Sequence, residues 1–508
     1  MQTPSEKLKQ WKTQCKREWI TAFLTVIILG LLTHLPVMIN DWPNHDGLAS
    51  LYFDQNMITS GRWFLSVACG ISSYFTIPWV IGIFSLVFLG LGAAALVEFL
   101  EIRETLWIIC VCGLLVTFPA LCSTYAYIFT ADGYMMALAL VFFAVMLTRK
   151  YRRGFLAGGI CLAFSMGIYQ SYLAFAILLS VYGCAEILMK EMTAKNKVKE
   201  MLHYLYMGMI GVILYFAVLH ILLFLEGKTL ASYQGINDMA AGAKQPLIVM
   251  LISIYHDFAA FTVKGNVLYN NIFSGVALLI LIVGFLVVCI RKHLVLSWKW
   301  WAVMIILAGF LPLGTNMILL ISPNVTYHLL MRYQWILYPI LLVAFILKQT
   351  ADNVPERALL QWGAFLAAAV LILNYAVTDN IAYSNLSKKY DKTYAYCLRL
   401  ADRMEQTNGY YTGIPVAMIG VQSKKNYPVT DLTDAVTSNM IGMTGDYLVY
   451  TDNNYQAFMK NYLGITINLV SDEKMEQIYK TQEYQALDSF PGNNSMKVVN
   501  GVLYIKTE

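Results

Sequence analysis

Runs of about twenty consecutive apolar residues recur along this 508-residue chain and restrict its fold more than any other feature. A bilayer core of roughly 30 Å takes about twenty helical residues to cross, and the helix satisfies its own backbone polar groups there. Such runs lie near residues 19–39, 76–99, 105–121, 131–148, 154–169, 171–189, 203–225, 271–290, 299–321, 330–348 and 358–378. Only 13% of the residues are charged, against about 25% in soluble domains. The sequence therefore predicts a mainly α-helical, polytopic membrane protein with about eleven transmembrane helices.

Basic residues gather in alternate connections between these runs. The N-terminal segment before residue 19 is basic, and further basic clusters lie at 148–153, 189–199, 291–293 and 348–357. Because Lys and Arg are enriched in short cytoplasmic loops, we expect the N-terminus and these connections to be cytoplasmic. No small-residue cleavage site follows the first apolar run, which predicts a retained helix and not a signal peptide.

The other connections lie on the predicted outer face and are rich in Asp, Asn, Tyr, Trp and Gly. They are residues 40–75, 122–130, 226–270, 322–329 and the tail from about 379. Within the third of them, the segment near 246–263 is apolar but short for a span. We expect it to form a helix on the membrane surface, and a re-entrant hairpin is the alternative.

The C-terminal tail, residues 379–508, predicts a small extracytoplasmic α/β domain that follows a transmembrane domain of residues 1–378. Its first segment has the pattern of an amphipathic helix. Short strands are expected at IPVAMIG and DYLVY, and the helix NYQAFMKNYLG ends in a Gly cap. The final MKVVNGVLYIKTE has the strand, Asn-Gly, strand pattern of a hairpin.

Cofactor and metal signatures are absent from the sequence. The nine cysteines are scattered and mostly lie in apolar runs, so we interpret them as buried apolar residues and not as metal ligands or a disulfide framework. Neither G-x-x-x-x-G-K nor a convincing G-x-G-x-x-G pattern occurs. We therefore expect no cofactor, no metal and no nucleic-acid partner. An enzyme that works outside the membrane lacks cytosolic nucleotide donors, so its substrate must be activated and carried through the bilayer.

The first outer connection, residues 40–75, concentrates titratable groups directly outside the first apolar run. Three aspartates, Asp41, Asp46 and Asp54, lie in its stretch NDWPNHDGLASLYFDQNMITSGRWF. A carboxylate that is partly buried is a better general base near neutral pH. Such a group is suited to taking a proton from a sugar hydroxyl.

Among these aspartates we favour Asp46 as the catalytic base. His45 beside it can hydrogen-bond an acceptor, and Gly47 leaves room for a substrate. Asp41 is the next candidate. The alternative interpretation is a solvated loop whose aspartates cap short helices.

Further polar residues stand at the outer ends of other runs. Arg62, in GRWF, presents a fork of donors suited to phosphate oxygens; the alternative is an interfacial arginine beside a tryptophan membrane anchor. Asp132, in FTADGY, is a carboxylate near the membrane, where such groups are costly and often functional. Tyr169 and Gln170 lie at an outer turn, from which they can bind substrate hydroxyls.

Two more candidates, His328 and Arg332, lie at the start of the tenth apolar run. His328 and Arg332 lie four residues apart in NVTYHLLMRYQW, on one helix face and among aromatic residues. A cation at this depth suits a lipid-linked phosphate, and the alternative is an aromatic belt with one anchoring arginine. Lys264 is a weaker phosphate candidate, because its charge is typical of an ordinary surface lysine.

The order of these motifs resembles that of the bacterial O-antigen-modifying glucosyltransferases, the Gtr-type enzymes of the GT-C superfamily. A basic N-terminal segment and the first span precede HD at 45–46 and GRW at 61–63, and FTADGY, YQS and Arg332 follow in the family's order. In that family an acidic pair precedes the Gly-Arg motif. Here the pair is His-Asp, which leaves Asp46 as the single direct carboxylate and argues against a two-carboxylate mechanism.

The resemblance covers the whole chain and implies a GT-C-like fold in the bacterial cytoplasmic membrane. It implies transfer of a hexose, typically glucose, from a polyprenyl phosphate to a cell-surface glycan, with a polyprenyl-phosphate glucosyl synthase and a flippase as partners. Inversion is expected for a single displacement, and Arg332 and Arg62 would stabilise the leaving phosphate. Phosphate is a good leaving group, so no metal is required.

Two other functions are left open by the sequence. A lipid-linked-sugar transporter or flippase would have charged or broken helices near the bilayer midplane and paired repeats. Here the charges gather at the ends of the runs, and no internal repeat is visible. A non-catalytic cell-envelope assembly protein would have no need of Asp46 for an activity, which separates it from an enzyme.

Overall fold

The computed structural model describes residues 3–7, 10, 15–49, 51–231, 246–292, 298–322, 325–350, 356–422 and 448–508. Its first helices are α2 (Arg17–Ile39), α3 (Leu65–Gly70), α4 (Pro78–Leu100), α5 (Thr105–Thr117), α6 (Pro119–Tyr125), α7 (Ala131–Lys150), α8 (Gly154–Ile168), α9 (Leu173–Met189) and α10 (Ala194–Glu226). They are followed by α12 (Leu247–Lys264), α13 (Ile272–Arg291), α14 (Trp298–Thr315), α15 (Met317–Ile321), α16 (Leu337–Gln349) and α17 (Arg357–Gln406). Short helices η1 (Gly47–Ala49), η2 (Ile58–Ser60), η3 (Ile128–Thr130), η4 (Gln170–Tyr172) and η8 (Leu329–Ile336) lie in the connections.

The predicted fold class is confirmed. Within the described ranges, 10 helices are long and apolar enough to cross a membrane, or 11 if a bent pair counts as one span. A small β-sheet follows near the C-terminus. Many apolar helices and one terminal sheet are therefore the architecture that the hydrophobic runs predict.

Three of the predicted segments differ in form from a single spanning helix. The run at 105–121 is divided at Pro119 into α5 and α6, which meet at a 46° bend, because the residue before a proline is driven out of the helical region. α8 has only 15 residues. The segment near 246–263 forms α12, whose 18 residues are mostly exposed. By length and hydropathy α12 is one of the ten candidate spans within the described ranges, so its position on the membrane surface stays a prediction.

Glycines let the central helices approach closely. α4 contacts α2 and α7, α7 contacts α8, and α8 contacts α10. A Cβ atom on Gly92 would lie 2.9 Å from the Cα atom of Ala139, and one on Gly158 would lie 2.7 Å from the carbonyl oxygen of Ala144. Small residues are typical of helix contacts in membranes, and here they bring α7 between α4 and α8.

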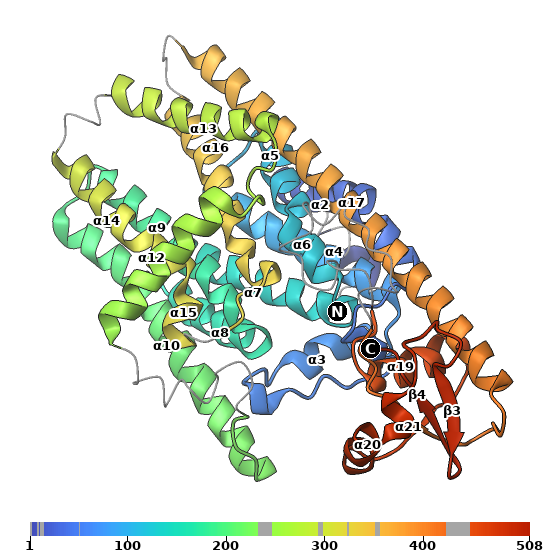
Figure 1. The fold of residues 1–508 in the computed structure, drawn as a ribbon. Helices are drawn as coiled ribbons and strands as arrows, with labels where there is room; N and C mark the ends of the chain where they lie inside the picture. Colours follow the sequence, from blue (N-terminus) through green and yellow to red (C-terminus); the bar gives the residue numbers. More distant parts are fainter. Residues whose placement is uncertain are drawn as a thin grey trace.

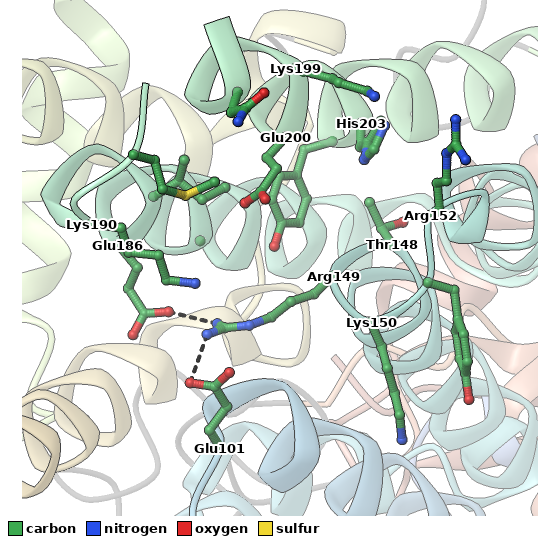
Figure 2. A pocket seen from close by; sticks show the side chains of 16 residues that line it. Glu101, Thr148, Arg149, Lys150, Arg152, Glu186, Lys190, Lys199, Glu200 and His203 are labelled. Carbon is green, nitrogen blue, oxygen red and sulfur yellow. Dashed lines mark hydrogen bonds and ion pairs between the residues drawn. The ribbon is translucent and has the colours of Figure 1, made fainter. Parts of the chain in front are cut away.

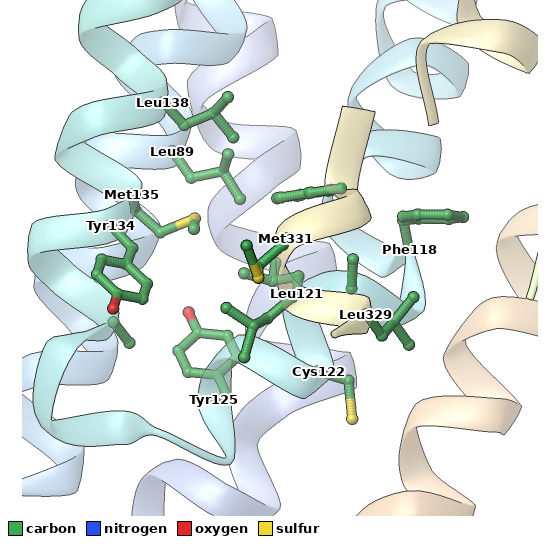
Figure 3. Packing of buried hydrophobic residues seen from close by; sticks show 14 of the residues in the cluster. Leu89, Phe118, Leu121, Cys122, Tyr125, Tyr134, Met135, Leu138, Leu329 and Met331 are labelled. Atoms are coloured by element: carbon green, nitrogen blue, oxygen red, sulfur yellow. The ribbon is translucent and has the colours of Figure 1, made fainter. Parts of the chain in front are cut away.

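An apolar layer joins these helices to η8 (Figure 3). Leu121 of α6 and Met135 of α7 face Leu329 and Met331 of η8 within one buried cluster. This packing fixes η8, which carries Arg332, relative to the first turn of α7.

Ion pairs tie together the helix ends that carry the basic clusters. Glu98 at the end of α4 accepts from Lys150 at 3.0 Å, and Glu186 of α9 accepts from Arg149 at 2.6 Å and from Lys348 at 2.8 Å. The clusters at 148–153 and 348–357 thus meet on one face, which the orientation argument requires. The side of the membrane on which this face lies stays a prediction.

The helix α17 runs for 50 residues along one edge of the molecule and ends beside the C-terminal sheet (Figure 1). At 1.5 Å per residue it is about 75 Å long, more than twice the thickness of a bilayer core. The predicted span at 358–378 and the amphipathic helix after it are therefore one element, because no proline separates them. The proposed domain boundary at 378/379 falls inside this helix.

Among the described residues, the C-terminal sheet contains four strands in the order β2-β1-β4-β3. β1 (Pro415–Ala417) pairs in parallel with β2 (Asn468–Leu469) and β4 (Val502–Ile505), and β3 (Met496–Val499) pairs antiparallel with β4. Two left-handed residues, Asn500 and Gly501, join β3 to β4, so the predicted hairpin is confirmed.

Two other predictions for this region have different outcomes. The helix α19 (Asp452–Phe458) and its continuation η9 (Met459–Leu463) end at Gly464 with a φ of 70°, which confirms the Gly cap. The strand predicted at DYLVY is wrong for residues 448–450, which join no ladder with the described strands; Leu448 and Val449 are buried in the core and Tyr450 is exposed. Residues 446–447 lie outside the described part of the chain.

Candidate active site

A cavity of about 540 Å³ lies at the end of the helices opposite the basic clusters. Its wall is formed by the connection between α2 and α4, by η3 and the start of α7, by η4, by α15 and by η8. Several residues that the sequence predicted lie on this wall: His45, Asp46, Arg62, Tyr169, Gln170 and His328. The fold thus gathers into one site four connections that are far apart in the sequence.

Asp46 projects from a turn that is held on both sides. The side-chain oxygen of Asn44 accepts a hydrogen bond of 2.7 Å from the backbone N–H of Gly47, three residues on. In the next short helix, the carbonyl of Leu48 accepts a 2.7 Å bond from Asn461 of the C-terminal region. The Asp46 side chain is 57% exposed, so it is less buried than the sequence predicted. Its carboxylate is open to a substrate in the cavity.

Two histidines flank this carboxylate. The Nε2 atom of His45 lies 3.5 Å from an Asp46 oxygen. Burial lowers the pKa of His45, and Lys389 lowers it further, whereas Asp46 raises it. Burial also lowers the pKa of His328, together with the nearby His45. Both imidazoles are therefore mainly neutral near pH 7 and can donate and accept hydrogen bonds to sugar hydroxyls.

Arg62 places a guanidinium on the same wall. Its Nη1 donates to the hydroxyl of Tyr134 at 3.3 Å, and its Cζ lies 5.3 Å from the centre of the Tyr169 ring. The two tyrosine rings stack on each other at 4.3 Å. Of the lysines and arginines that the structure describes, Arg62 alone lines this cavity. An anionic group bound there would meet a cation held against aromatic rings.

The turn before Arg62 requires a glycine. Gly61 has a φ of 76°, and a Cβ atom there would lie 2.5 Å from the hydroxyl of Tyr215 and 2.7 Å from Nε2 of Gln170. Gln170 donates to the carbonyl of Ser60 at 3.3 Å. The binding of substrate hydroxyls by Gln170 stays a prediction. The structure shows that Gln170 holds the turn that carries Arg62.

We expect Gly61→Ala to lower the free energy of unfolding by about 1–3 kcal/mol more than Gly227→Ala does. Both glycines have a positive φ, so the backbone strain of an alanine is common to both. Only Gly61 is crowded, since nothing lies within 4 Å of a Cβ atom on Gly227. Thermal unfolding of the two variants in detergent checks this, and equal losses would contradict the close packing of this turn.

Three predicted residues lie outside the cavity wall and near solvent. Asp54 accepts a hydrogen bond from the backbone N–H of Asn56 at 3.0 Å, as a turn residue does. Desolvation raises the pKa of Asp41, and a hydrogen bond from Tyr462 opposes this shift. Lys264 is exposed in the last turn of α12. None of the three lines the cavity.

Asp132 is buried behind the cavity and does not line it. Asp132 is 1% exposed, and its carboxylate accepts hydrogen bonds from the hydroxyl of Ser72 and from the backbone N–H of Gly133. The bond from Ser72 joins the start of α7 to the segment that follows α3. In this geometry Asp132 holds the connection 40–77 in place.

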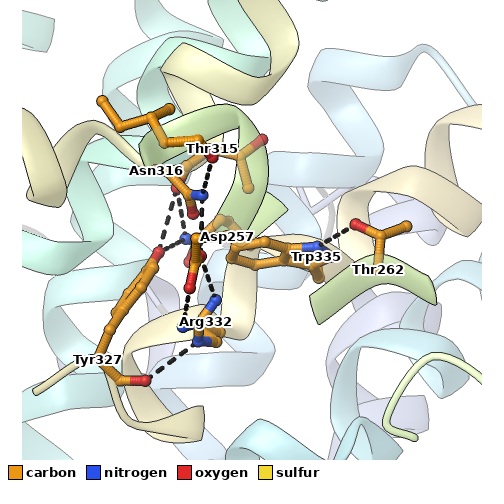
Figure 4. Close-up of polar contacts among 9 residues, drawn as sticks. Asp257, Thr262, Thr315, Asn316, Tyr327, Arg332 and Trp335 are labelled. Carbon is orange, nitrogen blue, oxygen red and sulfur yellow. Dashed lines mark hydrogen bonds and ion pairs between the residues drawn. The ribbon is translucent and has the colours of Figure 1, made fainter. Parts of the chain in front are cut away.

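Arg332 is engaged by a carboxylate that the sequence argument did not include (Figure 4). It is 7% exposed, and its Nη1 and Nη2 donate to the two oxygens of Asp257 at 2.7 and 2.8 Å. Its Nε donates to the Tyr327 carbonyl at 3.1 Å, and the Tyr327 ring centre is 3.8 Å from its Cζ. The ion pair joins α12 to η8. The phosphate role of Arg332 stays a prediction. In this geometry Asp257 occupies the two Nη donors that a phosphate would use.

A family model described as glucosyl transferase GtrII matches residues 35–347. This range contains every segment of the cavity wall and covers more than half of the chain. The chain belongs to the GtrII glucosyltransferase family. No curated protein matches it. Membership confirms the resemblance to Gtr-type enzymes and supports glycosyltransferase activity, with a sugar donor and an acceptor as substrates.

Tyr134 and Gln55 are two of the wall residues of this GtrII-family protein that were not predicted. Tyr134 lies two residues after Asp132 and belongs to the same outer motif, FTADGY, which could have indicated it. Gln55 is 4% exposed and has a φ of 56°, a conformation that costs a non-glycine residue about 1–2 kcal/mol. No sequence pattern marks Gln55. Backbone strain of this kind is concentrated at functional sites.

Asp257 was also missed, although the sequence contains a signal for it. It is the one carboxylate in the apolar segment 247–263. A charge in such a segment is costly unless it is paired. That cost predicts a cationic partner, and Arg332 is the partner in the GtrII-family fold.

We expect Asp257→Asn to destabilise the protein by about 3 kcal/mol and Arg332→Gln by less, about 1–2 kcal/mol. Asp257→Asn leaves the buried Arg332 charge without its partner, whereas Arg332→Gln leaves a carboxylate that is 31% exposed to solvent. The double variant should lose less than the two single losses together. Unfolding of the wild type, the two single variants and the double variant in detergent measures these losses. If Arg332 binds the phosphate, transfer should fall far more in Arg332→Gln than in Asp257→Asn.

Proposed function

We propose that this GtrII-family glucosyltransferase transfers glucose from a polyprenyl phosphate to a glycan on the outer face of the bacterial cytoplasmic membrane. The observation that carries the proposal is the meeting of Asp46 and Arg62 in one cavity at one end of the membrane helices. A direct displacement at a glycosyl phosphate needs a base for the acceptor and a cation for the leaving group. These two residues supply both charges.

In the proposed reaction, the Asp46 carboxylate takes the proton of an acceptor hydroxyl. The acceptor oxygen attacks the anomeric carbon and forms the new glycosidic bond. The bond between that carbon and the phosphate oxygen breaks, and polyprenyl phosphate leaves with the electron pair. Arg62 stabilises the charge that grows on the phosphate. A single displacement of this kind inverts the anomeric configuration.

The rest of the wall suits a hexose. Tyr127, Phe129 and Tyr134 supply ring faces and edges for the apolar side of the sugar. The neutral imidazoles of His45 and His328 supply donors and acceptors for its hydroxyls. We propose that this aromatic side holds the donor sugar next to the Asp46 carboxylate.

The polyprenyl chain is proposed to pass beside α15. Ile318 and Val325 form an apolar part of the cavity wall. A cleft of only about 10 Å³ between α9 and α15 shares Gln170, Ser171 and Ile318 with this cavity, so the helices would have to separate there for a lipid chain to pass. We propose that the lipid tail leaves the site between these helices, while its phosphate stays beside Arg62.

The C-terminal region is proposed to brace the catalytic connection. Besides the bond from Asn461 to Leu48, the Tyr450 ring packs edge-on against His45 at 5.8 Å between ring centres. Both contacts hold the turn that carries Asp46. In this proposal residues 379–508 lie on the same side of the membrane as the cavity, outside the cytoplasm.

We expect a reporter enzyme that is active only in the cytoplasm to be silent when fused after Glu508. The reason is the contact of the C-terminal region with the Asp46 turn, on the face opposite the basic clusters. The same reporter fused after Lys190, at the basic face, should be active and serves as the control. Activity of the C-terminal fusion would contradict the proposed orientation.

Mass spectrometry of surface glycans tests the proposed function. A deletion strain should lack a hexose that a strain complemented with the wild-type gene carries. The acceptor is the glycan whose mass changes. Identical glycan masses in both strains would count against transfer to a surface glycan and would favour an assembly role.

A further inference from the structure

A second cavity, of about 450 Å³, lies at the opposite end of the same helices (Figure 2). The helix α7 begins at the first cavity, which Tyr134 lines, and ends at the second, which Lys150 lines. Its 20 residues span about 30 Å, the thickness of a bilayer core. The second cavity is therefore at the depth of the lipid headgroups of the other leaflet.

Cationic side chains outnumber acidic ones around this cavity. Its wall contains the lysines and arginines Arg149, Lys150, Arg152, Lys190 and Lys199. The acidic wall residues are Glu101, Glu186 and Glu200. His203 and the hydroxyl-bearing Thr148 add polar groups. A wall of this composition favours an anion.

The ion pairs of the structure neutralise only part of this positive charge. Arg149 contacts Glu186 at 2.6 Å and Glu101 at 3.0 Å. Arg152 and Lys199 make no ion pair within the described residues. Figure 2 shows these two side chains toward one edge of the cavity, near His203 and apart from the Arg149 ion pairs.

The start of α10 adds to the positive potential. The helix begins at Ala194, and lysines occupy positions 195, 197 and 199 with no acidic residue in the first turn. A helix N-terminus already carries partial positive charge, which lysines there do not balance. A bound anion would offset both contributions, and the cavity next to this helix end gives it space.

We propose that this cavity binds the phosphate of an anionic phospholipid headgroup, in the leaflet opposite the transfer site. Arg152 and Lys199 are the main ligands, His203 can donate to a phosphate oxygen, and the acyl chains lie along the exposed apolar helices. Basic pockets at this depth between transmembrane helices are typical headgroup sites. The site would anchor the basic face of the helix bundle in the leaflet and is separate from the catalytic cavity.

The test compares two double variants of the full-length protein, delipidated in a zwitterionic detergent. Arg152→Gln/Lys199→Gln removes two charges from the cavity wall. Arg153→Gln/Lys195→Gln removes the same charge from neighbouring exposed residues that do not line it. Native mass spectrometry measures binding of phosphatidylglycerol and of phosphatidylcholine to each protein.

Wild-type protein should bind phosphatidylglycerol more tightly than phosphatidylcholine. The cavity variant should lose roughly tenfold to thirtyfold in phosphatidylglycerol affinity, and the control variant should stay within about twofold. Glu200→Gln, which removes a repelling carboxylate, should bind more tightly than wild type. Equal affinities in both double variants would overturn the proposal. Displacement of the lipid by millimolar inorganic phosphate or glycerol phosphate would show that the site takes a free phosphate and not a headgroup.

Discussion

Asp46→Asn is expected to lower glucose transfer by about 10²–10⁴-fold, which a glycan assay in cells would register as complete loss. The amide keeps the shape of the side chain but cannot take the proton of the acceptor hydroxyl. Because the side chain is 57% exposed and its turn is held by Asn44 and Asn461, the substitution should leave the fold intact. Transfer is measured by glycan mass spectrometry at matched protein level.

The same connection supplies matched controls for this variant. Asp41→Asn and Asp54→Asn remove carboxylates from the same loop, but neither residue lines the cavity. Both variants should retain most of the transfer activity. Normal glycan modification in the Asp46→Asn strain would end the assignment, and Asp41 would be the next base to test.

Arg62→Ala is expected to cost roughly two to three decades in transfer rate, or about 2–4 kcal/mol in the transition state. The guanidinium contributes most when the phosphate gains charge, so kcat should fall nearly as much as kcat/KM. Arg62→Lys should recover part of the loss, because the charge survives and the planar fork does not. The rate is measured with purified protein and a short-chain polyprenyl-phosphate glucose.

Lys264→Ala is the control for a general loss of positive charge on the same side of the membrane. Lys264 is exposed and does not line the cavity, so this variant should transfer at close to the wild-type rate. A rate for Arg62→Ala within about threefold of wild type would mean that Arg62 is an interfacial anchor. The phosphate role would then return to Arg332, released from Asp257 in the reacting complex.

The helices and part of the site follow directly from the sequence. Runs of apolar residues are long enough to identify spans by length alone. The cavity residues Asp46, Arg62 and His328 were found because polar groups at the ends of such runs are costly and few. The Asn-Gly hairpin at 500–501 was found because that turn has its own residue signature.

Features that depend on contacts between distant segments could not be predicted in this way. The pairing of Arg332 with Asp257 joins residues 75 positions apart, and hydropathy gives neither the partner nor the bidentate geometry. The unbroken course of α17 was missed because its composition changes from apolar to amphipathic without a helix-breaking residue. Gln55 was missed because its role depends on a left-handed backbone that no local pattern marks.

Transfer of labelled glucose by the purified protein tests the central claim most directly. The protein is mixed with acceptor glycan and either a short-chain polyprenyl-phosphate glucose or a nucleotide-linked glucose, and the product is followed by its label and its anomeric configuration. We expect transfer from the polyprenyl phosphate alone, with inversion, and loss of product in Asp46→Asn. Transfer from the nucleotide sugar alone, or equal product from wild type and Asp46→Asn, would contradict it.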